Sequence, residues 1–227
     1  MINFIFSNFN LIILSVWVIF FAIVVLRIVR PPLVKSVAYK YLIAGALSIH
    51  LLYGVATTWL TYIAWSMPLA NGAVNETGKM LLSAALPKEA PLPIGALEFM
   101  RPLFSGAHGY FAGYAFFHYF LSTIALLIIT GLFVLFFVMY KKEHPASFKA
   151  GDIEVITLAF LMAGYLGSIV LVPITLTLAV ILVLIKLAMK KSNHISISAV
   201  FIAATPIAFI FATPLLSLVH LWPLLKL

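Results

Sequence analysis

The chain has 227 residues, of which 64% are hydrophobic and 9% are charged. A soluble domain carries about a quarter charged residues, so this composition excludes a soluble protein and indicates a polytopic membrane protein. The formal net charge of +8 comes from short basic clusters between apolar runs, without the continuous basic face that nucleic-acid binding needs. The chain has no cysteine, which excludes disulfides, iron–sulfur clusters and thiolate nucleophiles.

The apolar runs predict an all-α integral membrane bundle of about six transmembrane helices, because one span needs about 20 apolar residues. The predicted spans are residues 10–27, 41–65, 108–140, 154–171, 173–189 and 197–221. We expect the first to be a retained helix, since it has neither a basic leader nor a small-residue cleavage site. The whole chain is then a single transmembrane domain.

The loop 66–107 is the longest predicted segment outside the membrane. Because long loops in compact proteins are usually functional, we expect it to act directly or to contact a partner. Residues 75–86 within it should form a short interfacial helix. The side chains expected to face lipid are Met80, Leu81, Leu82 and Leu86.

The apolar run 154–189 is too long for one straight span and contains Gly164, Gly167 and Pro173. We therefore expect a hairpin of two helices that turns near Gly167–Pro173. The alternative is one long tilted helix, which would move the C-terminus to the opposite side. In the last span, Pro206 and Pro214 should each cause a kink.

The distribution of basic residues orients this arrangement. One set of loops carries Arg27, Arg30, Lys35, Lys40, Lys141, Lys142, Lys149, Lys186, Lys190 and Lys191. The opposite side carries Lys79, Lys88, Arg101 and Lys226. The positive-inside rule predicts that the more basic loops are cytoplasmic and that both termini lie on the outer side of a cell or inner membrane.

Histidines are the candidate functional groups, because ionisable residues at membrane depth are costly to bury. His50, His118 and His220 lie in predicted spans, and His108 lies near the outer boundary. We expect no Asp or Glu well inside a span, which argues against an aspartyl protease and a carboxylate-coupled transporter. Neutral imidazole suits haem iron, copper or zinc.

His118 and His220 should lie at similar depths near the outer ends of their helices, given a rise of about 1.5 Å per residue. We therefore expect them to be the ligands of one b-type haem, with His108 as a substitute for either. His50 lies toward the inner half of its helix without an obvious partner. A hydrogen bond to a neighbouring helix explains His50 better than ligation.

Small and aromatic residues surround this region. Gly106, Gly109 and Gly113 fall on one helix face, which favours close helix packing over a cofactor groove. Tyr110 and Tyr114 would line a quinone or haem pocket, or belong to an interfacial aromatic belt.

Glu98 and Arg101 are three residues apart and should form an ordinary surface pair. The alternative is that Arg101 binds a lipid headgroup or a quinone carbonyl. Neither reading supplies a self-contained catalytic motif, and Ser105 with His108 lacks a third orienting residue.

These features favour an integral membrane subunit of a larger respiratory or electron-transfer complex, one that binds a b-type haem and quinol near the outer face. Its partners would be the lipid bilayer, other membrane subunits and a quinone. One alternative is a cofactor-free structural or assembly subunit. Another is a transporter or channel for a small solute or lipid, with the prolines of the last span as hinges.

Overall fold

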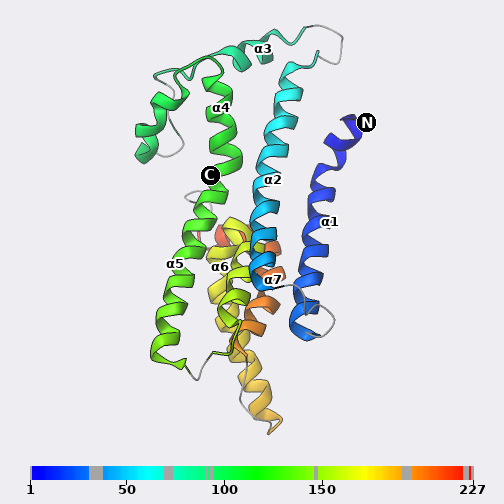
Figure 1. Ribbon diagram of the computed structural model, residues 1–227, viewed down its shortest axis with the longest axis vertical. Coiled ribbons are helices and arrows are strands. Elements are labelled where there is room, and N and C mark those ends of the chain that lie inside the picture. The colour runs from blue at the N-terminus through cyan, green and yellow to red at the C-terminus, as the bar shows by residue number, and fades with distance from the viewer. Residues whose placement is uncertain are drawn as a thin grey trace. The chain divides into compact units, whose positions relative to one another are not determined.

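The computed structural model describes residues 2–30, 38–68, 74–89, 92, 95–145, 148–190, 196–221 and 225. The elements in chain order (Figure 1) are α1 (Ile2–Val29), α2 (Tyr39–Ser66), α3 (Glu76–Ser83), the 3₁₀ helix η2 (Gly95–Phe104), α4 (Gly109–Ala115), the π-helix η3 (Phe116–Phe120), α5 (Leu121–Glu143), α6 (Asp152–Ala188) and α7 (Ile197–Leu218). The described residues include no strand. The predicted all-α class is confirmed.

Five helical stretches are long and apolar enough to cross a membrane. They are Asn8–Val29, Tyr39–Ser66, Gly109–Glu143, Asp152–Ala188 and Ile197–Leu218. The third runs without a gap through α4, η3 and α5. The fourth, α6, covers both of the spans that the sequence predicts for residues 154–189. The number of spans is therefore five when α6 is counted once and six when it is counted as two.

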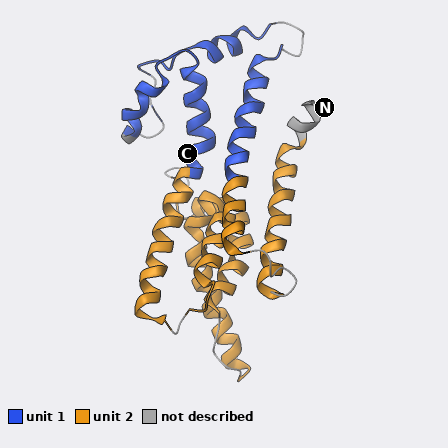
Figure 2. Cartoon of the chain, in the orientation of Figure 1, with its two compact units in different colours: residues 1–6, 50–123, 227 blue, residues 7–49, 124–226 orange. Residues whose placement is uncertain are grey.

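The chain forms two compact units (Figure 2). Unit 1 contains residues 1–6, 50–123 and 227, and unit 2 contains residues 7–49 and 124–226. Two continuous helical stretches, α2 and α4–η3–α5, pass from one unit into the other.

The core of unit 2 is built around the first three turns of α6. Ile156, Leu158, Ala159 and Phe160 have no exposed surface, so this segment is buried on nearly every side. The Phe160 ring stacks on Phe133 with ring centroids 4.8 Å apart. Burying side chains of this size contributes roughly 1.5–3 kcal/mol each, which makes this segment the main source of packing energy in the unit.

The chain reverses within α6. The Phe201 ring lies 5.8 Å from that of Phe160, and it lines the same groove as Val172 and Thr175. A straight helix would hold Phe160 and Thr175 roughly 22 Å apart. Both positions can lie beside Phe201 because the chain folds back between them.

Gly164 makes the reversal. Its φ of 72° and ψ of 176° break the helical geometry of α6, in a region of backbone space that is essentially restricted to glycine. The expected hairpin turn at Gly167–Pro173 is therefore misplaced. Gly167 instead faces α7, where a Cβ added to it would lie 3.5 Å from the Ala208 backbone, and Pro173 lies inside the second half of the helix.

Three helix ends in unit 2 lie together. The Arg27 guanidinium is 5.1 Å from the centre of the Tyr39 ring, and a Cβ added to Gly151 would lie 2.9 Å from that ring. The end of α1 and the starts of α2 and α6 therefore meet.

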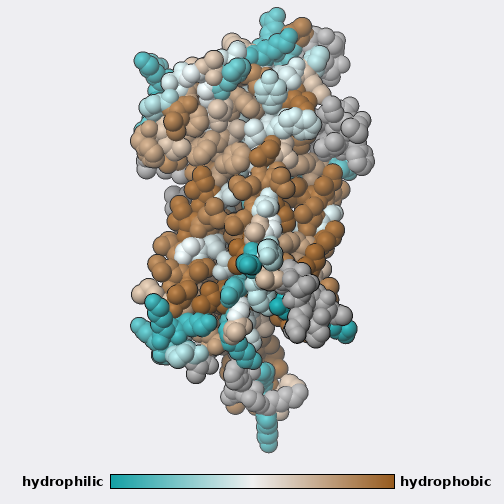
Figure 3. Space-filling view, viewed as in Figure 1, coloured by the Kyte–Doolittle hydropathy of each residue, from teal (hydrophilic) through white to brown (hydrophobic). Residues whose placement is uncertain are grey.

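On the face shown in Figure 3, unit 2 is mostly hydrophobic, with hydrophilic residues gathered where α5 ends. Of the predicted basic residues, Lys35, Lys191 and Lys226 lie outside the described ones.

In unit 1, the segment between α2 and α4 folds back onto the start of α4. Asn75 caps α3, since its side-chain oxygen accepts from Gly78 N at 2.9 Å, and its amide nitrogen donates to the Trp65 carbonyl at 3.2 Å. The α3 helix is shorter than the predicted 75–86. Leu82 is buried within unit 1 while Met80 is 62% exposed, so the expectation that both face lipid is wrong for Leu82.

Candidate functional site

His118 lies in η3, the π-helical turn between α4 and α5. Such turns are rare and often occur at functional sites, because the extra residue changes the direction in which side chains point. The ring is exposed, and its Nδ1 lies 2.9 Å from the Tyr114 carbonyl oxygen. A carbonyl can only accept a hydrogen bond, so Nδ1 carries the proton and Nε2 keeps the lone pair that a ligand would use.

Aromatic rings hold this imidazole in place. The Tyr114 ring stacks on His118 with centroids 4.0 Å apart and an angle of 21° between the planes. Tyr114 in turn lies 5.0 Å from Trp65 of α2, and Tyr110 lies 6.4 Å from the same indole. The two tyrosines of the sequence analysis are therefore brought together with His118 in one ring cluster.

Two contacts join this cluster to α2. The Thr61 and Tyr119 hydroxyls are hydrogen-bonded at 2.6 Å. The Phe120 ring also lies against Gly54, where an added Cβ would approach it to 2.8 Å. Gly54 is therefore a site of close approach between helices within unit 1, which is the role that small residues usually have in membrane helices.

His108 has a defined structural contact. Its backbone adopts the left-handed conformation with φ of 66° at the start of α4, and its Nδ1 lies 2.5 Å from the Leu82 carbonyl oxygen. This bond fixes the end of α3 against the start of α4. As at His118, the carbonyl partner leaves Nε2 as the nitrogen with a lone pair.

His220 lies beyond the end of α7, although the sequence places it inside the span 197–221. The helix ends at Leu218, and His220 has a left-handed φ of 58°. Its N–H bonds to the Ser217 carbonyl, and Leu221 N–H bonds to the Leu216 carbonyl, which is the Schellman arrangement of a helix C-terminus. His220 is exposed and belongs to unit 2, whereas His118 belongs to unit 1.

His50 is half-buried in α2 and takes part in an interaction with its surroundings. Across the described ranges, no three His, Asp or Glu side chains are grouped as they would be around a metal ion. A haem needs fewer protein ligands than that, since two axial histidines are enough.

Two of the three glycines near His118 have packing roles. Gly109 lies against the Phe104 carbonyl, closer than any side chain would allow, and Gly113 faces the Phe104 and Leu86 side chains. Gly106 faces open space. The packing that the sequence predicts is present at Gly109 and Gly113, but it is against η2 and the segment before it.

Arg101 forms the expected pair with Glu98. Its Nε and one terminal nitrogen donate to the two carboxylate oxygens at 2.7 and 2.8 Å, and its other terminal nitrogen donates to the Pro87 carbonyl at 2.8 Å. These hydrogen bonds lower the pKa of the Glu98 carboxyl. Arg101 therefore ties η2 to the chain that follows α3.

Sequence reasoning missed Asp152, the first residue of α6. Its carboxylate is 7% exposed and accepts hydrogen bonds from Lys149 N–H at 2.7 Å and from the Ser198 hydroxyl at 2.6 Å. The second bond joins the start of α6 to the start of α7. The sequence signal was a pair of carboxylates, Asp152 and Glu154, between Gly151 and an apolar run.

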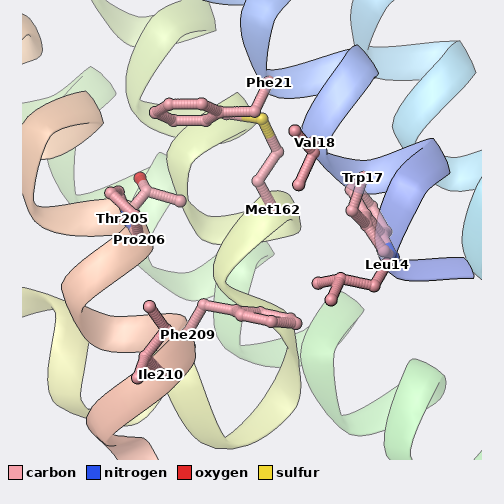
Figure 4. Close-up of a pocket in the computed structure, with 9 residues that line it drawn as sticks. All are labelled: Leu14, Trp17, Val18, Phe21, Met162, Thr205, Pro206, Phe209 and Ile210. Carbon is pink, nitrogen blue, oxygen red and sulfur yellow. The ribbon is translucent and has the colours of Figure 1, made fainter. Parts of the chain in front are cut away.

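Unit 2 also has an apolar pocket of about 290 Å³ between α1, α6 and α7. Figure 4 shows Met162 reaching toward Phe21, with Trp17 of α1 and Phe209 of α7 on its other sides. The one hydroxyl in its lining, on Thr205, already donates to the Phe201 carbonyl at 2.9 Å.

The comparisons with known proteins give no relative on which to base a function. No family model matches the chain, and neither a curated protein nor a solved structure is significantly similar to it.

Proposed function

We propose that the chain is an integral membrane subunit of a larger respiratory or electron-transfer complex, and that His118 is an axial ligand of a b-type haem. The observation that carries this proposal is the state of the His118 imidazole. It lies in a π-helical turn of an apolar helix, and its Nδ1–H is held by a backbone carbonyl.

That bond is the usual arrangement behind a metal-bound histidine. Ligating imidazoles commonly donate their second N–H to a carbonyl or carboxylate, which fixes the tautomer and raises the basicity of the other nitrogen. Tyr114 stacked on the ring restricts its rotation as well. A group prepared in this way loses less entropy when it binds iron.

The proposed second ligand is His220, with His108 as the substitute. Both are exposed, and each lies at a helix end. His108 would keep its Nδ1 bond to Leu82 and offer Nε2. When bound, haem would supply one-electron transfer, and Tyr110, Tyr114 and Arg101 would contact quinol beside it.

We further propose that the basic helix ends face the cytoplasm and that both termini lie on the outer side. The meeting of Arg27, Tyr39 and Gly151 supports a common side for the end of α1 and the starts of α2 and α6. The fold-back at Gly164 supports it too, because it returns α6 toward the side on which it begins. Positive loops on one side are the strongest general signal of cytoplasmic orientation.

The test is a dithionite-reduced minus oxidised optical spectrum of the full chain purified with its native partners. We expect a b-type signal that is lost in His118→Ala and in His220→Ala. His144→Ala is the matched control, since His144 is an exposed imidazole just beyond the end of α5, with its ring 4.6 Å from that of Tyr140. Protein that is spectrally flat would overturn the haem proposal.

A cofactor-free assembly subunit is the second candidate. It is favoured by the bonds of His108 and His118 to backbone carbonyls, since histidines that only fix helices make the same contacts. This reading expects His118→Ala to lower the yield of the assembled complex and to leave its absorbance unchanged.

A transporter of a small or lipid-like solute is the third candidate. It is favoured by the break at Gly164, because interrupted membrane helices often border substrate sites. Pro206 and Pro214 lie inside α7, which packs against α6. Uptake of labelled solutes into vesicles, reduced in a Gly164→Ala variant, would favour it.

A further inference from the structure

The chain between α3 and α4 forms a closed hairpin in unit 1. Leu86 N–H donates to the Phe104 carbonyl at 3.0 Å, and the Arg101 guanidinium donates to the Pro87 carbonyl at 2.8 Å. The two ends of the segment 86–104 therefore meet. We call this segment the η2 hairpin, because η2 forms its second half.

The η2 hairpin packs along the start of the continuous helical stretch α4–η3–α5 (Figure 1). Phe104 lies at the start of α4, since a Cβ added to Gly109 would overlap the Phe104 carbonyl group. Its ring lies 5.7 Å from that of Phe117, and Leu92 is buried in the same cluster as Phe117 and Leu121. Leu121 lies roughly 18 Å beyond Gly109 along the helix, at about 1.5 Å per residue. The hairpin therefore extends beside the helix for several turns.

The opposite end of the same helical stretch indicates how deep this position is. Lys141 and Lys142 lie in the last turn of α5, and the hydrocarbon must end before them because charged side chains are costly inside it. A hydrocarbon core about 30 Å thick takes about 20 residues of helix, which places its other boundary near Leu121. The η2 hairpin therefore lies on the headgroup side of this boundary, with Leu92 at the level where the hydrocarbon begins.

Two features of unit 1 agree with a position among the headgroups. The stretch between Gly109 and Leu121 is rich in rings, and Tyr114 lies 5.0 Å from Trp65 of α2, as in the aromatic belts of membrane interfaces. Residues 84–89 are not helical, and such backbone does not face lipid inside the hydrocarbon. The headgroup layer contains water and accepts it.

The outward face of η2 is apolar. Phe99 and Leu103 are 75% and 73% exposed, and Pro102 between them is exposed as well. Glu98, the carboxylate beside Phe99, is bonded to Arg101 at 2.7 Å. The charged residues of the hairpin sum to zero net charge: Lys88, Glu89, Glu98 and Arg101. The hairpin thus presents an apolar surface without a net charge that would select anionic lipid.

We infer that the η2 hairpin docks on the bilayer, with Phe99 and Leu103 inserted at the tops of the acyl chains in the leaflet on the side where α4 begins. Lipid is the occupant because this face lies at the depth of the bilayer interface, beside a helix that spans the membrane. The absence of net charge makes a zwitterionic phospholipid sufficient. Part of the segment 66–107 then lies in the membrane, where composition alone predicts a loop outside it. No histidine and no haem is involved, so this inference stands apart from the proposed function.

The test is the accessibility of a spin label in the full chain in phosphatidylcholine nanodiscs. The chain has no native cysteine, so Phe99→Cys and Leu103→Cys each give one labelled position. Oxygen concentrates in lipid and a nickel chelate stays in water, so the ratio of their collision rates with the label reports its depth. Ile128→Cys, 60% exposed in α5, is the hydrocarbon reference, and Glu143→Cys, exposed at the end of α5, is the water reference.

We expect the oxygen-to-nickel ratio to fall in the order 128, 99, 103, 143. Position 99 should lie about 8 Å deeper than position 103, because a 3₁₀ helix rises about 2.0 Å per residue and η2 ends at the start of α4. Equal nickel access at positions 99 and 143 would show that the face lies in water and would overturn the inference. Protection of position 99 from both reagents would show that protein covers it, and would overturn the inference as well.

A second measurement needs no substitution. The unchanged chain is placed in nanodiscs with a phosphatidylcholine that carries a photoreactive diazirine near the glycerol end of its acyl chain, and labelled peptides are mapped. We expect label on residues 97–103. Label on α5 with none on residues 97–103 would contradict the insertion of η2.

Discussion

The two units of the chain are stabilised in different ways. Unit 1 relies on polar contacts among rings and backbone, such as the Thr61–Tyr119 hydroxyl pair and the His108–Leu82 bond. Unit 2 relies on a dry core around Phe160 and on one buried carboxylate, Asp152. Both units are built from apolar helices. In unit 1 these helices surround polar groups that can bind a ligand, and in unit 2 they pack around a helix that reverses direction.

This difference bears on where function can reside. A polar cluster within apolar helices must satisfy its hydrogen bonds internally, and His118 does so while leaving one nitrogen for a ligand. A packed core transmits changes in volume directly to stability. Substitutions in the packed core of unit 2 should therefore affect stability most, and those in the ring cluster around His118 in unit 1 should affect ligand chemistry.

The largest loss of stability is expected for Phe160→Ala in unit 2. Phe160 has no exposed surface and packs on Phe133 and Phe201, so its removal should cost about 3–5 kcal/mol. Phe136→Ala is the control, because Phe136 is 57% exposed. Unfolding in mixed detergent micelles measures both, and similar losses would show that the core does not lie around Phe160.

Asp152→Ala should come next, at about 3 kcal/mol, because it leaves the Lys149 N–H and the buried Ser198 hydroxyl without their charged acceptor. Glu154→Ala removes an exposed carboxylate from the same helical turn and should change little. The same unfolding assay applies. Two equally small effects would contradict a structural role for the Asp152–Ser198 bond.

Gly164→Ala should cost about 2 kcal/mol, although an added Cβ there meets nothing within 4 Å. The cost comes from the backbone, because the observed φ and ψ are strained for any residue with a side chain. Gly131→Ala in α5 also meets open space and should be neutral or stabilising. If Gly164→Ala behaves like Gly131→Ala, α6 is not broken at this residue.

The smallest effect is expected at Glu98 in unit 1, and it should depend on pH. The hydrogen bonds from Arg101 lower the pKa of Glu98 below its usual 4.5, so the pair stabilises the folded chain above that pH. The contribution is lost as the pH falls through the lowered pKa. Glu98→Gln should lower the thermal midpoint at pH 7 and not at low pH, whereas Glu89→Gln should have no effect at either.

The sequence was sufficient for the class and for most helices, because long apolar runs leave few alternatives to membrane helices. The sequence predicts the turn of α6 near Gly167–Pro173 and not at Gly164, since only the backbone angles distinguish these positions. The π-helical turn at His118 has no composition signal, and Phe120, its last residue, packs on Gly54. His220 was misplaced because a helix end inside an apolar run carries no mark.

The reversal of α6 brings the start of α6 beside the start of α7 at the Asp152–Ser198 bond, so its direct measurement comes first. The chain has no native cysteine, and Glu154 and Val180 are exposed, which allows spin labels to be attached at these two positions alone. Pulsed electron resonance should give a distance under about 20 Å if the chain folds back at Gly164. A distance near 39 Å, the length of a straight helix at about 1.5 Å per residue, would contradict the fold-back.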